Sequence, residues 1–475
     1  TIYAAHQKGG TLDTERGFLS TFASFISISG GASVGIYGPL VHFGGTLGAF
    51  LRRRRFMPVI PHDIIIGSGV AAAISAGFGS PLAGIIFAHE VVLRHFSMKA
   101  VSSVALSSIT ASVVATEIGL VEPPFRFEEI AFNYSLALPG LVIVGVCCAI
   151  MALVFMNGLI LSGQIAKKIN LKPHYNPIIP AILCGLVGCF IPEVLGLGIT
   201  TVLDMITTNN ILIFLILILL FKLFLTCTCI GFGFFGGIFS PAIFLGASVG
   251  AIVFHLPFFE TSSELQPIFV VAGMAALSSS VIGAPITAII LIMELTGSYK
   301  YAIASIFPIV ISTLITYHTF ASSFFDKQLS LRGIIMSYGR EHIILSQQTI
   351  KQYSTNDYVY FDKNIKVNDA IKKFKQNSST EGYFINTDKK YFGKLRLIDI
   401  IDKDNELSFQ YREKKSIIIY DTSNINECIR ILTDFVGESV PIINKSTKTL
   451  VGIISENDVL KSYSQISNEI RTIEK

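Results

Sequence analysis

The sequence of 475 residues is 51% hydrophobic and only 15% charged, and its net charge is +4. The charges are spread unevenly, because the first 336 residues carry 16 basic and 14 acidic side chains and the last 139 carry 21 and 19. This split excludes a single water-soluble globule and predicts a polytopic membrane domain followed by a soluble tail. The mild, mixed charge also argues against a nucleic-acid partner.

Apolar helical segments follow one another through the first part of the chain. Eleven are expected, over residues 34–50, 64–74, 82–94, 100–118, 136–161, 178–190, 211–229, 238–254, 268–281, 286–295 and 302–320. Several are short and contain glycine, and such helices exist at membrane depth only where protein or a polar cavity covers their ends. The pattern therefore predicts an all-α bundle of the channel or transporter kind, surrounded by a lipid bilayer.

A duplicated pattern is the most informative feature of this domain. Glycines and a proline recur at the same spacing in Gly35, Pro39, Gly44, Gly48 and in Gly237, Pro241, Gly246, Gly250. A proline followed nine residues later by a glutamate also occurs twice, as Pro81 with Glu90 and as Pro285 with Glu294. The two offsets are 202 and 204 residues, so the domain is built from a duplicated unit of about 200 residues.

In the tail, from about residue 345, short strands alternate with amphipathic helices. The segments VYF, VNDAIKKFKQN, GYFINT and FGKLRLIDII make one β-α-β-β-α unit, and IIIYDT, NINECIRILTDF, SVPIINK and LVGIISENDVLKSY make a second. The expected domains are a membrane domain over residues 1–337 and two α/β units over residues 345–404 and 415–466.

The sequence shows no pattern typical of an enzyme. Six of the seven cysteines lie in apolar runs, without the spacing of a metal site or a disulfide framework. There is no nucleophile–base pair and no phosphate-binding loop. We therefore expect no metal, no required cofactor and no catalysis.

Two proline-containing helix starts, at Gly38-Pro39 and Ser240-Pro241, form the candidate binding site. The first turn of a helix has unpaired N–H groups, and glycine lets a ligand approach the main chain closely. Two such starts aimed at one point would attract a small anion that has lost its water. The alternative is that the glycines only allow close helix packing. The duplication favours the anion site.

These segments resemble the CLC chloride channel and transporter family. GGASVGIYGPLVHFGG and FKLFLTCTCIGFGFFGGIFSPAIFLG are similar to its GREGP and GxFxP regions, AISAGFGSPLAGIIFAHEV and AGMAALSSSVIGAPITAIILIMELTGSY match further helices, and a CBS-like pair follows. The resemblance covers nearly the whole chain. It implies an inverted repeat, a homodimer with one anion pore per subunit, and central anion ligands in the amides of Ile238 and Phe239. The family's serine-bearing motif GSGIP is expected upstream of Thr1.

The departures from the family pattern decide the predicted function. The anion-binding residues that the resemblance implies are Gly35, Ile36, Tyr37, Gly38, Pro39, Gly237, Ile238, Phe239, Ser240 and Pro241. Tyr37 falls at the position of the gating glutamate, Val91 at that of the inner proton-transfer glutamate, and Ser330 near that of the inner-gate tyrosine. A phenol stays neutral at pH 7 and valine carries no proton, so proton coupling is expected to be lost. The prediction is a passive chloride channel.

Two other functions stay open at this point. His89 can serve as a substitute proton relay, which would make the chain a chloride/proton antiporter. Alternatively, Tyr37 plugs the pore of a non-conducting membrane protein whose tail senses a nucleotide. Glu90 and Glu294 are interpreted as structural acceptors for backbone amides. Lys222 either raises the local positive potential, snorkels to the interface or pairs with a carboxylate.

The tail carries one candidate ligand site. Residues 452–458 have the G-h-h-S-x-x-D form with which CBS-like domains bind an adenosine ribose, here through Ser455 and Asp458, whereas the first unit has Arg396 in place of the hydroxyl. An adenine nucleotide is therefore a candidate ligand, and a purely dimerising or stabilising tail is the alternative. We expect an integral protein of a bacterial-type inner or plasma membrane, with the CBS-like pair in the cytoplasm.

Overall fold

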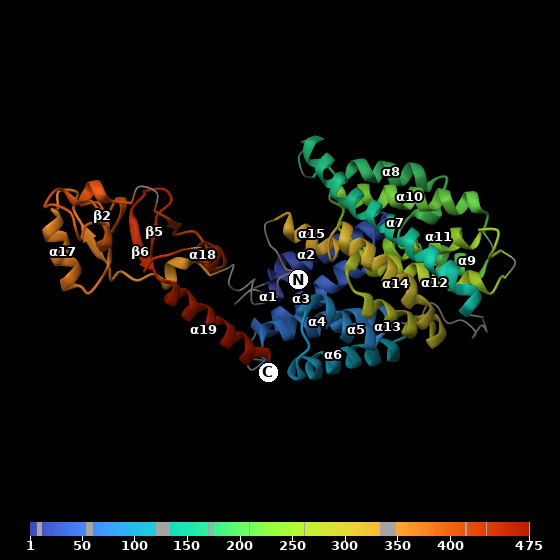
Figure 1. The fold of residues 1–475 in the computed structure, drawn as a ribbon. Helices are drawn as coiled ribbons and strands as arrows, with labels where there is room; N and C mark the ends of the chain where they lie inside the picture. Colours follow the sequence, from blue (N-terminus) through green and yellow to red (C-terminus); the bar gives the residue numbers. More distant parts are fainter. Residues whose placement is uncertain are drawn as a thin grey trace. The chain divides into compact units, whose positions relative to one another are not determined.

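The computed structural model describes residues 1–6, 12–53, 60–119, 134–169, 172, 174–208, 210–260, 262–332, 348–413, 416–433 and 435–474. The chain divides into two compact units, residues 1–337 and residues 338–474. The first unit is helical, and the second contains all of the described strands (Figure 1).

The membrane unit is a bundle of helices of very different lengths. In chain order its described helices are α1 (Ile2–His6), α2 (Thr14–Ser29), α3 (Tyr37–Arg53), α4 (His62–Phe78), α5 (Pro81–Phe87), the π-helical turn η1 (Ala88–Leu93), α6 (Met98–Glu117), α7 (Tyr134–Ile169), α8 (Ile178–Gly188), the 3₁₀ turn η2 (Pro192–Val194), α9 (Ile199–Thr207), α10 (Leu212–Gly231), α11 (Phe239–Phe254), α12 (Leu265–Ile282), α13 (Pro285–Thr296), α14 (Tyr299–Thr319) and α15 (Phe324–Ser330). Ten of the eleven expected apolar segments each overlap one of these helices, and the segment 82–94 covers both α5 and η1. The sequence did not predict the helices α1, α2, α9 and α15.

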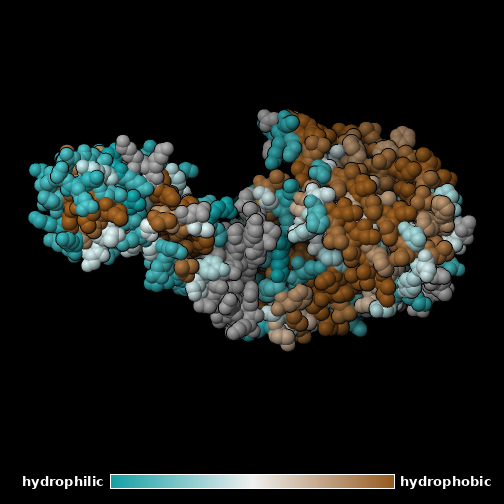
Figure 2. All heavy atoms as spheres, in the orientation of Figure 1, coloured by the Kyte–Doolittle hydropathy of each residue, from teal (hydrophilic) through white to brown (hydrophobic). Residues whose placement is uncertain are grey.

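Five of the described helices, α6, α7, α10, α12 and α14 with its extension to Ser330, are long and apolar enough to cross a membrane. The surface of this unit is mostly hydrophobic in Figure 2, while that of the tail is mostly hydrophilic. Large apolar side chains such as Phe22, Leu106 and Ile182 are more than half exposed. A bilayer covers such a surface without the cost that water would impose, so the first unit is an integral membrane domain.

The two halves of the membrane unit pack their helices through glycines at matching positions. A Cβ added to Gly44 of α3 would collide with the carbonyl oxygen of Gly69 on α4, and a Cβ added to Gly246 of α11 would collide with that of Gly273 on α12. The next glycine of each pattern meets the partner helix in the same way. The close-packing interpretation therefore holds for these glycines, and the helix starts remain as the candidate site.

The halves run in opposite directions, and each half caps a helix of the other. The carboxylate of Glu90, in η1, accepts backbone hydrogen bonds from Ile286 (3.0 Å) and Thr287 (2.8 Å) at the start of α13. Glu294, near the end of α13, accepts two hydrogen bonds of 2.8 Å from first-turn amides of α5. This reciprocal pairing requires antiparallel helices, so the repeat is inverted. The interpretation of both glutamates as structural acceptors is confirmed.

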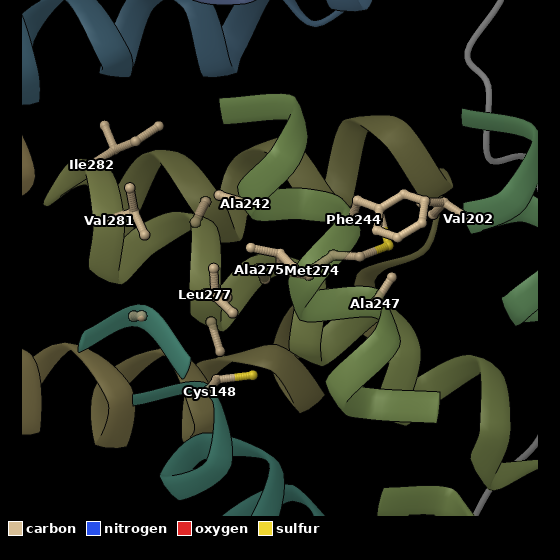
Figure 3. Close-up of a cluster of buried hydrophobic side chains, with 14 of the residues drawn as sticks. Cys148, Val202, Ala242, Phe244, Ala247, Met274, Ala275, Leu277, Val281 and Ile282 are labelled. Carbon is tan, nitrogen blue, oxygen red and sulfur yellow. The ribbon is translucent and has the colours of Figure 1, made fainter. Parts of the chain in front are cut away.

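The core of the membrane unit lies around α11 and α12, which pack against each other and against α7. Helix α12 is buried along nearly its whole length. Figure 3 shows Ala242 and Ala247 of α11 near Met274 and Ala275 of α12, with Cys148 of α7 in the same cluster. A helix that is apolar all round is expected in such a central place.

The tail consists of two units with the same topology. Its described elements are the 3₁₀ turn η3 (Ile350–Tyr353), β1 (Val359–Phe361), α17 (Val367–Gln376), β2 (Glu381–Ile385), β3 (Tyr391–Arg396), the 3₁₀ turns η4 (Leu397–Asp399) and η5 (Ser408–Tyr411), β4 (Ile419–Tyr420), α18 (Ile425–Leu432), β5 (Val440–Ile443), β6 (Leu450–Ile454) and α19 (Glu456–Glu474). In each sheet the first strand runs parallel to the second and the second antiparallel to the third. The expected closing helix of the first unit is only the turn η4, a correction to the predicted pattern.

The two tail units share a buried polar contact. Lys394 pairs with Glu381 at 2.7 Å, and both side chains are at most 5% exposed. Lys394 also donates to the carbonyl of Ser439 in the second unit (2.9 Å), and the Ser439 N–H donates to Glu381 (2.9 Å). Ile350, which precedes β1, packs into the core of the second unit. The tail therefore folds as one interlocked α/β body.

Candidate functional site

The starts of α3 and α11 lie directly against each other. The Gly35 N–H donates to the Gly237 carbonyl at 2.7 Å, and the Gly237 N–H donates back to the Gly35 carbonyl at 2.6 Å. The backbones are so close that a Cβ added to Gly38 would lie 2.9 Å from the Cα of Gly237. The structure thus brings together the two motifs that lie about 200 residues apart in the sequence.

Each helix start presents amide groups that have no helical partner. The first-turn residues are Tyr37, Gly38 and Pro39 in α3, and Phe239, Ser240 and Pro241 in α11. Proline has no N–H, so the third position donates nothing in either helix. Helices of 17 and 16 residues also direct the positive ends of their dipoles to this place. Backbone groups alone therefore suit it to a small anion.

Ile36 and Ile238 are the residues that precede the two helices. The Ile36 carbonyl accepts the first helical hydrogen bond, from Leu40 (3.0 Å), and the Ile238 carbonyl does the same for Ala242 (3.0 Å). Both carbonyls thus point into their helices. The N–H groups of each first turn therefore point the other way, out of the helix start. The ten predicted anion-site residues therefore lie in two contacting turns.

Three aromatic rings pack at this junction. The ring of Tyr37 stacks on Phe78, the last residue of α4, with the centroids 3.6 Å apart and the planes at 14°. Phe239 packs edge-on against both, at 5.8 Å from Tyr37 and 5.4 Å from Phe78. Within the described residues the Tyr37 hydroxyl has no hydrogen-bond partner. Ring packing therefore sets the position of Tyr37, and its hydroxyl is left to a ligand or to water.

A small cavity of about 30 Å³ adjoins the stacked rings. It is lined by Tyr37, Phe78, Leu197, Ile199, Val202, Ser240 and Ile243. Two of these lining residues, Tyr37 and Ser240, have a hydroxyl side chain, and none of them has a carboxylate. Ser240 is 6% exposed, and its Oγ has no partner within the described residues.

A second cavity, of about 370 Å³, shares no lining residue with the first. It is lined by His89, Glu90, Val91, Arg94, Phe96, Ile282, Gly283, Ser322, Ser323 and Asp326. Val91 is 4% exposed, and the two ring nitrogens of His89 are buried without partners in the described part of the chain. Arg94 pairs with Asp326 at 2.6 Å. Val91 and His89 thus lie on a different cavity from Tyr37.

Ser330 lies apart from both cavities. It is the exposed last residue of α15, whereas Ser323 at the start of the same helix lines the larger cavity. Its assignment to the inner gate stays a prediction.

Lys222 supports the turn that leads to α3. Its side chain is fully buried, and Nζ donates to the carbonyls of Val194 (3.0 Å) and Gly196 (2.8 Å). The Ser33 hydroxyl donates to the same Val194 carbonyl at 3.0 Å and contacts Thr226 Oγ1 at 3.2 Å. Carbonyls rather than a carboxylate thus hold the ammonium, and the segment before Gly35 is tied to α10.

The family model described as voltage gated chloride channel matches residues 1–317, two thirds of the chain. The chain belongs to this family, the CLC family. A CBS domain model matches residues 411–465. Because the first tail unit repeats the topology of the second, the tail is a CBS pair.

Curated relatives and solved structures agree with the CLC assignment. A voltage-gated ClC-type chloride channel ClcB of Escherichia coli is 27% identical over 319 residues, which cover 66% of this chain and 75% of that protein. A slow cyanobacterial Cl⁻/H⁺ antiporter shares the fold, with a TM-score of 0.63 at 22% identity over 70% of this chain and 79% of the other. A CLC-type fluoride/proton antiporter gives a TM-score of 0.55 at 23% identity over 66% and 76%.

In the CBS pair, the predicted nucleotide residues bond to each other. The Ser455 hydroxyl donates to Asp458 Oδ2 at 2.6 Å, and the Asp458 N–H donates to Ser455 Oγ at 3.2 Å, which caps the start of α19. In the first unit Arg396 pairs with Asp399 through bonds of 2.9 and 3.0 Å. The Arg396 guanidinium already binds both oxygens of the Asp399 carboxylate, so the second unit is the better candidate for binding a ribose.

Proposed function

We propose that this CLC protein conducts chloride passively, without proton exchange. The observation that carries the proposal is the aromatic junction, where Tyr37 occupies the gate position and stacks on Phe78. A carboxylate at that place would compete with an anion when ionised and carry a proton when neutral. A neutral phenol does neither, and it offers the anion a hydrogen-bond donor.

The two helix starts supply the binding energy for the anion. Their unpaired amides and dipole ends replace part of the water that a chloride ion loses when it enters the membrane. The hydroxyls of Tyr37 and Ser240 add donors at the same junction. No step of this path requires a group that changes its charge, so chloride is expected to move down its own gradient.

The inner position also lacks a proton carrier in this proposal. Val91 is buried and lines the larger cavity, where an acid would have to accept protons from water. Glu90 beside it is engaged by three hydrogen bonds from the first turn of α13. A carboxylate held in this way stabilises the helix start and is a poor proton shuttle.

The test is to reconstitute the full chain into liposomes and to record chloride efflux and pH together. The expected result is chloride efflux after a potassium ionophore is added, with no proton uptake against its gradient. Stoichiometric proton movement would overturn the passive proposal. Absence of chloride efflux would favour a non-conducting sensor in which Tyr37 plugs the path.

A variant at the gate position tests the assignment of Tyr37 as the gate. Tyr37→Glu restores a titratable group at the junction, so efflux should become dependent on pH and voltage, with less flux at high pH where the carboxylate competes with chloride. Tyr37→Phe is the matched control, because it keeps the ring and adds no charge. An unchanged pH profile in Tyr37→Glu would remove Tyr37 from the gate.

The alternative is a chloride/proton antiporter that uses His89. The supporting observation is that both ring nitrogens of His89 are buried without partners in the described chain while the residue lines the larger cavity. Arg94, Asp326 and Glu90 line the same cavity, and His95 is near in sequence. If His89→Leu abolishes a proton flux that the parent chain shows, this alternative replaces the passive one.

For the CBS pair we propose a regulatory adenine-nucleotide site at Ser455 and Asp458, on the cytoplasmic side of a homodimer. Titration of the full chain with ATP or AMP tests it, with Asp458→Asn as the variant that should weaken binding. Arg396→Lys, which changes the matching residue of the first unit without adding a hydroxyl, is the control. Chemical cross-linking in liposomes tests the dimer.

A further inference from the structure

Two buried cysteines of the membrane unit lie in contact with each other, and the proposed conduction does not use them. Cys184 is in α8 and Cys229 is near the end of α10, and their sulfur atoms are 3.4 Å apart. Both are free thiols. Cys227, two residues before Cys229, instead lies against the Phe155 carbonyl, at 3.8 Å. The fold therefore selects one thiol of the Cys-Thr-Cys segment and places it against a cysteine that is 45 positions away in the sequence.

The helix that carries Cys184 lies at the edge of the membrane unit, beside α10 (Figure 1). Ile182 and Leu186 of α8 are 58% and 59% exposed, whereas Cys184 is 6% exposed and faces α10. An S–S bond is about 2 Å long, so the two sulfurs must approach by about 1.4 Å to form one. A helix with one free side can make such a shift without repacking the centre of the bundle. Cys184 is also the member of the pair that a small reagent reaches first.

The thiol pair also supports the segment that leads to the anion site. The Ser33 backbone interacts with both sulfurs, and the Ser33 hydroxyl donates to the Val194 carbonyl at 3.0 Å. Two residues later, Gly35 forms the double hydrogen bond with Gly237 that joins the two helix starts. When the sulfurs move, the Ser33 backbone must move with them or lose its contact. A change at the thiols is thus transmitted to the start of α3.

We propose that Cys184 and Cys229 are an oxidative modification site, at which a peroxide forms a disulfide that ties α8 to α10 and slows the anion path. Hydrogen peroxide first converts the Cys184 thiol to a sulfenic acid and releases water. The Cys229 sulfur then attacks the Cys184 sulfur, the S–S bond forms, and a second water leaves. The two thiols together lose two electrons and two protons, which reduce one peroxide to two water molecules. Contact between the sulfurs makes the second step fast.

The experiment treats the full chain in liposomes with hydrogen peroxide, alkylates the remaining thiols in denaturant and maps disulfides by mass spectrometry. The expected product is a disulfide between Cys184 and Cys229 that dithiothreitol removes. Cys184→Ser and Cys229→Ser should each abolish it, and Cys227→Ser, the matched control on α10, should leave it intact. Oxidation of the exposed Cys189 shows that the peroxide has acted. If Cys189 is oxidised while Cys184 and Cys229 are still alkylated, the proposal is wrong.

Efflux from the same liposomes tests the link to the anion site, and this part alone rests on the proposed conduction. Peroxide should slow chloride efflux about two- to tenfold in the parent and in Cys227→Ser, the range expected when one hydrogen bond beside the path is lost. Dithiothreitol should restore the rate, and Cys184→Ser and Cys229→Ser should not respond. A disulfide that leaves efflux unchanged would overturn the link. A parent chain without chloride efflux would contradict the proposed conduction, while the disulfide mapping would still decide whether the thiol pair is a modification site.

Discussion

The two cavities lie at repeat-related ends of α4 and α12, yet they differ in size and lining. Helix α4 ends at Phe78, beside a cavity of about 30 Å³. Helix α12 ends at Ile282, its repeat equivalent, beside a cavity of about 370 Å³. The next residue is a left-handed glycine at both ends, with φ of 65° and 76°. The duplicated backbone thus fixes the scaffold, and single side chains decide whether an end is closed or open.

The closed end is also the end at which the helix starts meet. There the stacked pair Tyr37 and Phe78 adjoins the small cavity, whereas charged and hydroxyl side chains line the larger one. In the proposed channel this asymmetry places the narrow point of the path at the aromatic junction. The wider cavity would offer hydrated access.

The largest expected effect is a loss of stability when the glycine contacts that both halves share are filled. Gly44→Ala and Gly246→Ala each force a methyl group against the backbone of the neighbouring helix, so each should destabilise the protein by about 3 kcal/mol or more. Thermal unfolding in detergent measures this loss. Gly163→Ala on α7 is the control, because its Cβ would meet no atom within 4 Å. A clear difference between Gly44 and Gly246 would show that the halves are not equivalent.

The next effect concerns the reciprocal helix caps. Glu90→Ala removes three hydrogen bonds to the start of α13, and Glu294→Ala removes two to the start of α5. We expect losses of about 2–4 and 1–3 kcal/mol respectively, since each change leaves the amides of a helix start without their acceptor. The matching glutamine variants keep acceptors and should retain part of the stability. A larger loss at Glu294 would reverse the predicted order.

The comparison of the two ends can be tested by exchanging their residues. Phe78→Ile removes the ring stacked on Tyr37, and it should raise chloride efflux about two- to tenfold, the range expected for one aromatic pair. Ile282→Phe adds a ring to the wide cavity. It should lower chloride efflux, and by a smaller factor than Phe78→Ile raises it. Liposome efflux measures both variants. Slower efflux in Phe78→Ile would mean that the stack supports the path and does not restrict it.

The smallest effect lies in the tail, where the two units differ at equivalent core positions. Ala370 of α17 matches Cys428 of α18, and both are fully buried. Burial raises the pKa of the Cys428 thiol to about 12, so it stays protonated and unreactive between pH 7 and 9. A maleimide should label Cys428 only in denaturant, whereas the exposed Cys189 reacts in the native protein. Cys428→Ala should cost only about 1 kcal/mol.

The helix starts and the glutamates could be predicted because their chemistry is local. Glycine and proline at fixed spacing mark the starts of α3 and α11, and a lone glutamate in an apolar helix needs a donor. Which amides satisfy Glu90 could not be predicted, since they come from the opposite half, 196 and 197 residues away. Phe78 was missed for the same reason: only the fold places it on Tyr37.

Helix α2 shows another limit of the sequence pattern. Six of its sixteen residues are serine or threonine, which lowers the apolar signal. In the structure three of these hydroxyls bond back to the same helix: those of Ser20 and Thr21 donate to the Gly17 carbonyl, and that of Ser27 donates to the Ala23 carbonyl. The helix itself thus satisfies the polarity of these three side chains, so they do not prevent it from forming.

The bridge between Gly35 and Gly237 has a consequence for biosynthesis. Its two hydrogen bonds join residues that are 202 positions apart, so the first motif is synthesised and inserted long before its partner exists. Until α11 arrives, the start of α3 has bare amides and no opposing turn. If the chain conducts anions as proposed, a nascent or truncated chain therefore contains no half-working pore, and anions pass only when the second half is in place.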